Sequence, residues 1–291
     1  MKHSNHLDLF ELKRSLQPAS KLEEQLLLDY LAGNVNILTL YDDEYPVALT
    51  QMSSPPVLYI RGSMPNNIVA AVVGTRNPTD PFIALNRRLV LKLTEKNVSV
   101  LSGLALGHDI IAHSHWLSLD IPNKPKPVVV LPFLNSVYPS SHSSIFEQLI
   151  EQGACVVAPI YDGSDANLKG SLIYRDSIQA LLSHGVFPLE FGSTSGTLHC
   201  VSAALKHDVR LFSFKFLHYS QGVEILQTTQ RQNVESFSKV FQDAYGKYKG
   251  SIPMSYAISK SDDLDMAIKF MRSYKTSLML RKSVVEEPSF I

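Results

Sequence analysis

The feature that most constrains the fold is a series of short apolar segments that alternate with helix-like segments between residues 68 and 214. The expected strands cover 68–73, 98–101, 127–132, 154–159, 185–190 and 209–214. The helices between them cover about 82–96, 108–118, 143–152, 174–183 and 197–207. Continuously apolar strands separated by helices are typical of a parallel sheet that is covered on both faces. The sequence therefore predicts an α/β fold with a doubly wound, mostly parallel sheet.

The segments on either side of this pattern predict three parts. Residues 1–62 hold a small helical N-terminal segment, with "LDLFELKRSL" and "KLEEQLLLDYLAG" at helical spacing, and then two short extended pieces around proline-containing turns that disfavour a helix. Residues 63–216 form the sheet domain. Residues 217–291 form a C-terminal extension, in which "VESFSKVFQDAYGKYKG" and "DDLDMAIKFMRSYK" are expected helices and "VVEEPSFI" is an expected tail.

The charge balance limits the kind of anion site that this chain can carry. Lysine and arginine together number 27, as do aspartate and glutamate, whereas a protein that coats duplex DNA usually has a basic excess. An anion site must therefore be local. Cys155 and Cys200 lie among apolar neighbours and are expected to be buried thiols in a reducing compartment. Without an apolar leader or a run of membrane-spanning length, we expect a cytoplasmic protein that makes no membrane contact.

The segment after the first expected strand has the residue types of a phosphate site. Ligands of open α/β sheets lie at the carboxyl ends of the strands, and Gly74, Thr75 and Arg76 stand at this position. Glycine permits close approach of a ligand to the backbone, and an arginine fork suits a phosphate. An ordinary strand-to-helix turn with a surface arginine explains these three residues equally well.

The segment after the second expected strand is a glycine-containing turn. Ser102 and Gly103 open it, and Gly107 precedes a helix that carries Asp109 and His113 four residues apart on one face. The turn is neither G-x-G-x-x-G nor G-x-x-x-x-G-K-[ST], so we expect no nicotinamide or other cofactor. We also expect no metal, because the histidines of this helix have no ligand-spaced partners elsewhere. A structural Asp–His contact that fixes the helix over the turn is expected instead.

A third segment, after the fifth expected strand, is a hydroxyl-rich loop that leads into a helix. It contains Ser195, Gly196 and Thr197. Backbone amides at a helix start, together with the helix dipole, form a ready anion site. A loop with N-capping hydroxyls would use the same residues. Two such loops on neighbouring strand ends, with Arg76 nearby, favour the anion site.

In their order along the chain, these segments resemble the DNA-processing protein A (DprA/Smf) family over about residues 37–214. "VVGTRNPT" resembles the family's Gly-Ser-Arg motif, "LSGLALGHDIIAH" its Ser-Gly-Leu-Ala turn, "YRDSIQALLSHGVFPLE" its Arg-Asn-Arg segment and "STSGTLHC" its Ser-Gly-Ser-Leu loop. The resemblance implies a Rossmann-like domain over 63–216 that binds single-stranded DNA without catalysis. It also implies a homodimer that acts in DNA processing, uptake or recombination by presenting DNA to a RecA-type recombinase. No clear winged helix follows the domain.

On this resemblance we expect the DNA phosphates to contact Gly74, Thr75, Arg76, Ser102, Gly103, Gly107, Lys169, Arg175, Ser195, Gly196 and Thr197, with Asp109 and His113 in structural roles. The chain departs from the Arg-Asn-Arg motif. Asp176 replaces the asparagine and Ser177 the second arginine, which removes a positive charge and adds a negative one. Tyr174 and Phe191 are candidates for base stacking.

The alternative function is that of a nucleotide-binding sensor or nucleotide-processing enzyme of the wider SLOG group. The loop "GSTSGTLHC" faintly resembles the Pro-Gly-Gly-x-Gly-Thr-x-x-Glu loop of nucleoside-monophosphate phosphoribohydrolases. Cys200 stands where that loop has its catalytic glutamate, so we expect no hydrolysis. A scaffold that recognises a protein partner through residues 215–291 remains a third interpretation.

Overall fold

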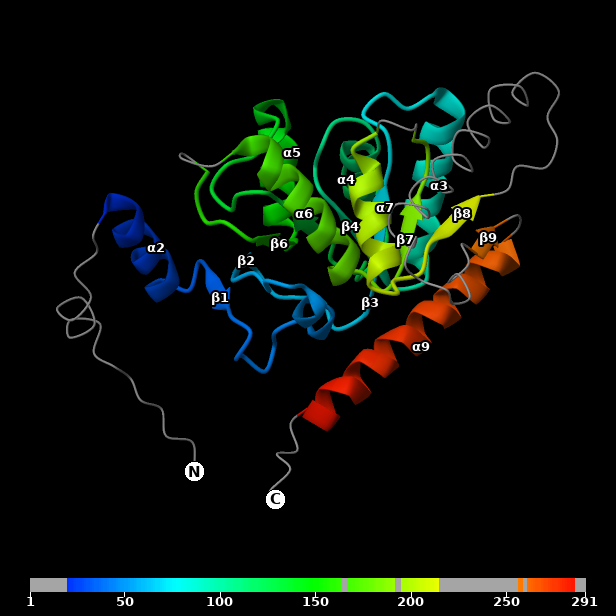
Figure 1. The fold of residues 1–291 in the computed structure, drawn as a ribbon. Coiled ribbons are helices and arrows are strands. Elements are labelled where there is room, and N and C mark those ends of the chain that lie inside the picture. The colour runs from blue at the N-terminus through cyan, green and yellow to red at the C-terminus, as the bar shows by residue number, and fades with distance from the viewer. Residues whose placement is uncertain (1–19, 164–166, 192–194, 215–255, 259–260, 286–291) are drawn as a thin grey trace.

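The computed structural model describes residues 20–163, 167–191, 195–214, 256–258 and 261–285. Its centre is a seven-stranded sheet with the strand order β1-β2-β6-β5-β4-β3-β7 (Figure 1). Five neighbouring strands run parallel, namely β3 (Ile68–Val73), β4 (Val98–Ser102), β5 (Val128–Val130), β6 (Cys155–Ala158) and β7 (Val186–Pro188). Two antiparallel strands, β1 (Asn36–Leu38) and β2 (Leu58–Arg61), extend the sheet beyond β6. The predicted mostly parallel α/β sheet is confirmed.

Helices cover both faces of this sheet, as predicted. One face packs against α3 (Asp80–Glu95), α4 (His108–Ser118) and α5 (Ser143–Glu151). The other face packs against α6 (Leu168–Leu182), α7 (Thr197–Lys206) and the 3-10 helix η1 (Val47–Gln51). Successive side chains of β3 point to opposite faces and join two separate hydrophobic clusters. Burial on both faces explains why this strand is apolar at every position.

Several elements differ from their expected bounds. Helix α6 begins at Leu168, six residues before the expected start at 174, because the Asn167 side chain caps it by accepting a hydrogen bond from Gly170 N (3.2 Å). The 3-10 helix η1 forms directly after Pro46, in a region expected to be extended. A proline just before a helix or in its first turn removes none of the helix's own hydrogen bonds. Pro46 stands just before η1, and its carbonyl oxygen accepts from Leu49 N at 2.9 Å.

The N-terminal helix and the last expected strand are present in modified form. Helix α2 (Lys21–Leu31) corresponds to the second expected helix, whereas "LDLFELKRSL" lies outside the described residues. Strand β8 (Phe212–Phe214) pairs in parallel with β9 (Tyr256–Ile258), a strand that the sequence pattern did not predict. An isolated bridge between Val186 and Leu211 places this pair beside β7.

The C-terminal helix packs against the same core as the sheet. Helix α9 (Ser261–Val285) confirms the helix expected around 262–275, while "VESFSKVFQDAYGKYKG" lies outside the described residues. Ile268 and Met271 belong to the hydrophobic cluster on the sheet face that packs against α3, α4 and α5. The Lys275 ammonium donates to the carbonyl oxygens of Asn66 and Asn67, just before β3. In Figure 1, α9 accordingly crosses below the sheet at the amino end of β3. The domain limits at 62–63 and 216–217 stay predictions.

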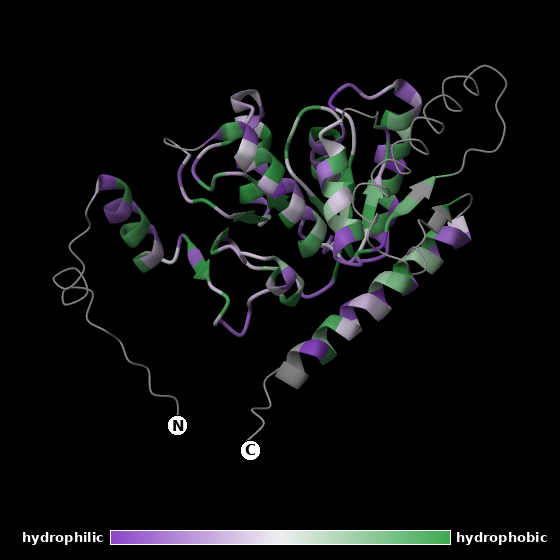
Figure 2. Ribbon diagram, in the orientation of Figure 1, coloured by the Kyte–Doolittle hydropathy of each residue, from purple (hydrophilic) through white to green (hydrophobic). Residues whose placement is uncertain are grey.

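The distribution of hydropathy follows this arrangement. Figure 2 shows hydrophobic residues along the strands of the central sheet, while α3 and α9 carry both hydrophobic and hydrophilic residues along their length. A helix with one apolar side is typical of packing onto a sheet. None of the helices that the structure describes is both long enough and apolar enough to cross a membrane.

The attachment of α9 can be tested by truncating one side chain. Met271 is 0% exposed and lies against Gly185, where an added Cβ would come within 2.9 Å of the Met271 Sδ. We expect Met271→Ala to lower the free energy of unfolding by about 2–5 kcal/mol, because it leaves a cavity between α9 and β7. Met279→Ala, on the same helix but 60% exposed, should change it by less than about 0.5 kcal/mol. Urea unfolding measures both, and equal effects would contradict this packing.

Candidate functional site

A pocket of about 800 Å³ opens at the carboxyl ends of the parallel strands, on the opposite edge of the sheet from the contact between α9 and residues 66–67. Its walls come from the loops after β3, β4 and β5, from the start of α4, from much of the length of α6 and from the start of α7. The expected phosphate-binding residues that line it are Gly74, Thr75, Arg76, Lys169, Arg175, Ser195, Gly196 and Thr197. Asp109 also lines it, whereas Ser102, Gly103, Gly107 and His113 do not.

The glycines behind the pocket allow its loops to approach closely. Gly107 has a φ of +79°, and a Cβ there would lie 2.2 Å from the Thr75 carbonyl oxygen. His108 N donates to that same oxygen at 3.2 Å, which joins the loop after β3 to the start of α4. A Cβ at Gly103 would lie 1.1 Å from Arg175 Nη1. Both glycines are therefore needed for packing, and their contact with a ligand stays a prediction.

Ser102 and His113 are buried behind the same wall. The Ser102 hydroxyl donates to the Val72 carbonyl oxygen at 2.7 Å, which ties β4 to β3. Burial lowers the pKa of His113 to about 4, although the charge of Asp109 acts in the opposite direction, so the ring is neutral at pH 7. We find no hydrogen bond between Asp109 and His113 in the described part of the chain. Asp109 Oδ2 instead accepts from Gly103 N at 3.1 Å.

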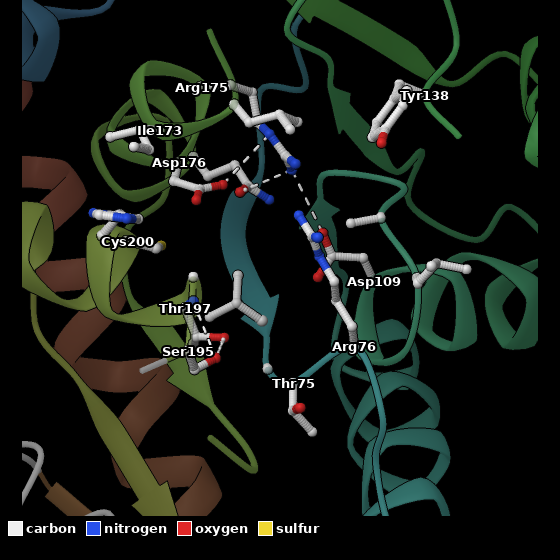
Figure 3. Close-up of a pocket in the computed structure, with 18 of the residues that line it drawn as sticks. Thr75, Arg76, Asp109, Tyr138, Ile173, Arg175, Asp176, Ser195, Thr197 and Cys200 are labelled. Carbon is white, nitrogen blue, oxygen red and sulfur yellow. Dashed lines mark hydrogen bonds and ion pairs between the residues drawn. The ribbon is translucent and has the colours of Figure 1, made fainter. Parts of the chain in front are cut away.

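Arg175 is held by protein groups at the back of the pocket. Its side chain is 4% exposed and lies between two carboxylates, with Nη1 3.5 Å from Asp109 Oδ2 and Nε 3.4 Å from Asp176 Oδ1 (Figure 3). Nη1 also donates to Gln179 Oε1 at 3.1 Å. Two negative charges surround this guanidinium, so its attraction for an anion in the pocket is largely compensated.

The environment of Asp176 disfavours its charge. The pKa of this carboxyl is raised to about 6, mainly by burial. The charge of Arg175 lowers the pKa, Asp109 raises it and Arg76 lowers it, with smaller effects than burial. The residue that departs from the Arg-Asn-Arg motif thus titrates close to neutral pH.

Two other cations of the pocket are exposed to solvent. Arg76 follows β3 and reaches toward Asp109 in Figure 3, and Lys169 lies in the first turn of α6. Neither makes a hydrogen bond or an ion pair with any residue that the structure describes. Free cations of this kind can bind an anion without first breaking a contact within the protein.

The start of α7 adds neutral hydrogen-bonding groups. Gly196 precedes the ten-residue helix, and Ser195 Oγ donates to Thr197 Oγ1 at 3.0 Å. The amide of Thr197 points back at Ser195 Oγ, at 3.3 Å. Hydroxyls and helix-start amides beside Arg76 favour a phosphate or another oxyanion. No three His, Cys, Asp or Glu side chains gather as metal ligands within the described ranges.

The structure corrects the expected base-stacking residues. Phe191 is buried, and the Tyr174 hydroxyl donates to the Ser54 carbonyl oxygen at 3.2 Å, so neither ring lines the pocket. The aromatic side chain that does line it is Tyr138, from the loop after β5. Tyr138 lies outside the four segments that carry the family resemblance above and was not among the expected site residues. Gln179 and His199 also line the pocket and carry no signal of their own.

The raised pKa of Asp176 predicts how a substitution alters stability with pH. The folded state binds this proton more tightly than the unfolded chain, so the ionised carboxylate destabilises the fold above pH 6, and this effect disappears as the pH falls toward 4. Asp176→Asn should therefore be more stable than the parent at pH 8, on the order of 2–3 kcal/mol, with a gap that closes toward pH 4. Denaturant unfolding at several pH values measures this.

A matched control is Asp43→Asn, which makes the same change at an exposed position. The free energies of unfolding of this variant and of the parent should be nearly equal at every pH from 4 to 8. If Asp176→Asn were less stable than the parent at pH 8, the attraction to Arg175 would outweigh the burial of Asp176.

Comparison with known proteins places the chain in a family. The family described as DNA recombination-mediator protein A matches residues 36–244. Protein Smf of Synechocystis sp. is 30% identical over 196 residues, which cover 65% of this chain and 48% of that protein. The chain thus spans about half the length of this relative.

Two solved structures have a similar fold. DNA processing protein A from Helicobacter pylori, whose structure is described as showing a unique single-stranded DNA binding mode, is 25% identical with a TM-score of 0.54 over 72% of this chain and 96% of its own. DprA from Streptococcus pneumoniae is 19% identical with a TM-score of 0.60 over 89% of this chain and 90% of its own, and supports the fold alone. Because the family match covers residues 36–244, which is most of the chain, this protein belongs to the DNA recombination-mediator protein A family.

Proposed function

We propose that this protein binds single-stranded DNA in the pocket at the strand ends and acts in DNA processing or recombination. The observation that carries the proposal is the exposed Arg76, which faces the pocket with no bonding partner in the described residues. Membership of the family and the single-stranded DNA binding stated for the Helicobacter pylori protein support it. The sensor and enzyme alternatives have no comparable support.

The division of charge in the pocket favours contact with a few phosphates. Arg175 is compensated by Asp109 and Asp176, so Arg76 and Lys169 supply the attraction. Backbone amides and side-chain hydroxyls at the start of α7 can add hydrogen bonds to phosphates, and such bonds do not depend on base sequence. A flexible single strand can bend a phosphate into such a pocket, whereas a rigid duplex presents its phosphates on the outside of a rod.

Family membership also motivates a proposal for the finer role. We propose that the protein works in the cytoplasm as a homodimer, takes part in DNA uptake or recombination, and presents the bound strand to a RecA-type recombinase. A binding role without catalysis fits the pocket chemistry. Cys200 stands at the position of the hydrolase glutamate, and burial raises the pKa of its thiol, so it is a neutral, unreactive group. Asp109 and Asp176 are both engaged by Arg175.

Removal of the Arg76 side chain tests the phosphate contact. A hydrogen bond to a charged group contributes about 1.5–3 kcal/mol, so Arg76→Ala should bind oligo(dT) at least about tenfold more weakly. Arg88→Ala makes the same change in net charge at an exposed site on α3 outside the pocket, and should bind nearly as the parent does. Fluorescence anisotropy at fixed salt compares the three proteins. Equal losses in both variants would indicate a diffuse charge effect and remove Arg76 from the site.

The salt dependence of binding tests the size of the site. If the pocket neutralises two or three phosphates, log affinity should fall against log salt with a slope of about −1.4 to −2.1, since each phosphate on a single strand contributes about −0.7. Duplex of matched length should bind more weakly. A much steeper slope, or a preference for duplex, would point to a broad basic surface and contradict the local pocket.

A further inference from the structure

Glu190 is a buried carboxylate that does not line the pocket and forms no ion pair with any residue that the structure describes. It comes two residues after β7 and is 9% exposed. Its Oε2 accepts from Thr79 N at 2.8 Å and from Thr79 Oγ1 at 3.2 Å. A buried charge costs stability unless hydrogen bonds compensate it, and both of these bonds come from one residue. The positions of Glu190 and Thr79 therefore depend on each other.

The contact between these two side chains fixes the start of α3. Thr79 is the N-cap residue of this helix, and its own side chain makes no capping hydrogen bond. In a capping box, a glutamate at the third helical position accepts from the N-cap amide. In α3 that position holds Phe82, and Glu190 supplies the acceptor from the loop after β7, 111 residues further along the chain than Thr79. A negative charge at this point also suits the helix dipole.

Glu190 holds the other end of the same loop as well. Its carbonyl oxygen accepts from Thr75 N at 2.6 Å. Residues 75 and 79 are thus both bonded to Glu190, one to its backbone and the other to its carboxylate, and Arg76 lies between them. The exposed Arg76 side chain has no bonding partner of its own in the described residues, so the backbone of this loop determines where the guanidinium can reach.

We propose that Glu190 is a positioning residue for the phosphate contact, because its carboxylate fixes the loop 75–79 and thereby holds Arg76 at the pocket. The inference rests on the proposed function and adds a residue that acts on the strand only through Arg76. The sign of its effect is diagnostic. A carboxylate that acted on DNA only through its charge would repel the phosphates, so its removal would tighten binding. Removal of a carboxylate that positions Arg76 weakens binding instead.

Three variants separate the charge of the carboxylate from its acceptor oxygen. Glu190→Ala removes both and should weaken the binding of oligo(dT) by about threefold or more, but by less than Arg76→Ala, since the guanidinium is loosened and not deleted. Glu190→Gln keeps an acceptor for Thr79 N and should bind nearly as the parent does. Glu147→Ala removes the same charge at an exposed position on α5 outside the pocket and should not weaken binding. Tighter binding by Glu190→Ala, or equal losses in both Glu190 variants, would overturn the proposal.

Combination with Arg76→Ala distinguishes positioning from a general loss of structure. In the Arg76→Ala background, Glu190→Ala should weaken the binding of oligo(dT) no further, because the side chain that it positions is absent. A further loss as large as the one measured in the parent background would show that Glu190 acts on other groups, and it would contradict the proposal.

Tryptic cleavage after Arg76, followed by mass spectrometry, gives a readout that needs no DNA. A loosened loop is cut faster, so Glu190→Ala should be cleaved there faster than the parent and Glu190→Gln, while cleavage after the buried Arg175 stays slow. Faster cleavage at both sites would mean that Glu190 stabilises the whole fold, and unchanged cleavage after Arg76 would mean that it does not hold the loop. Either result overturns the positioning role while DNA binding stands. If the parent binds no oligo(dT) at low salt, the proposed function fails, and the positioning role fails with it.

Discussion

A buried guanidinium joins the two helix layers at the carboxyl edge of the sheet. Arg175 belongs to α6 on one face, and its ion-pair partner Asp109 belongs to α4 on the other. The two side chains meet over the turn after β4, where Gly103 leaves room for Arg175 and donates its amide to Asp109. A buried charge is stable when it is paired and hydrogen-bonded, and removal of one partner of such a pair costs about 3–5 kcal/mol. The back wall of the pocket therefore depends on this contact.

The same contact determines which charges the pocket offers to a ligand. The carboxylates that stabilise Arg175 also screen it, so the outward attraction comes from Arg76 and Lys169 at more exposed positions. This division is consistent with a chain whose 27 basic and 27 acidic residues balance, because a small local excess is enough to bind a few phosphates. Asp176, where the sequence departs from the motif that it resembles, lies with its Oδ1 3.4 Å from Arg175 Nε and adds a second carboxyl group beside this guanidinium.

The opposite edge of the sheet is closed by the C-terminal helix. Lys275 of α9 donates to the backbone just before β3, and Met271 fills space beside Gly185, next to β7. These contacts place α9 at the amino end of the strands whose carboxyl ends open into the pocket. The contacts of α9 and the pocket thus lie on different edges of one sheet, and the carboxyl edge is where open α/β folds usually bind their ligands.

The sequence by itself determined the elements whose signals are local. Strand β3 covers the expected residues 68–73 and α4 the expected 108–118, because apolar runs and helical spacing depend on near neighbours. The strand-end rule likewise predicts a shared site for Arg76 and Ser195, and both line the pocket. The loops that carry these residues lie close together because the carboxyl ends of parallel strands meet at one edge of the sheet.

The tertiary structure alone decided everything that depends on contacts between distant segments. It inserted β2 antiparallel beside β6, paired β8 with β9, and placed Tyr138 in the pocket while Phe191 was buried. It also turned Arg175 toward two carboxylates, which no local pattern predicts. Burial and charge pairing are set by whichever side chains the fold brings together, and those partners lie as far apart as residues 109 and 175.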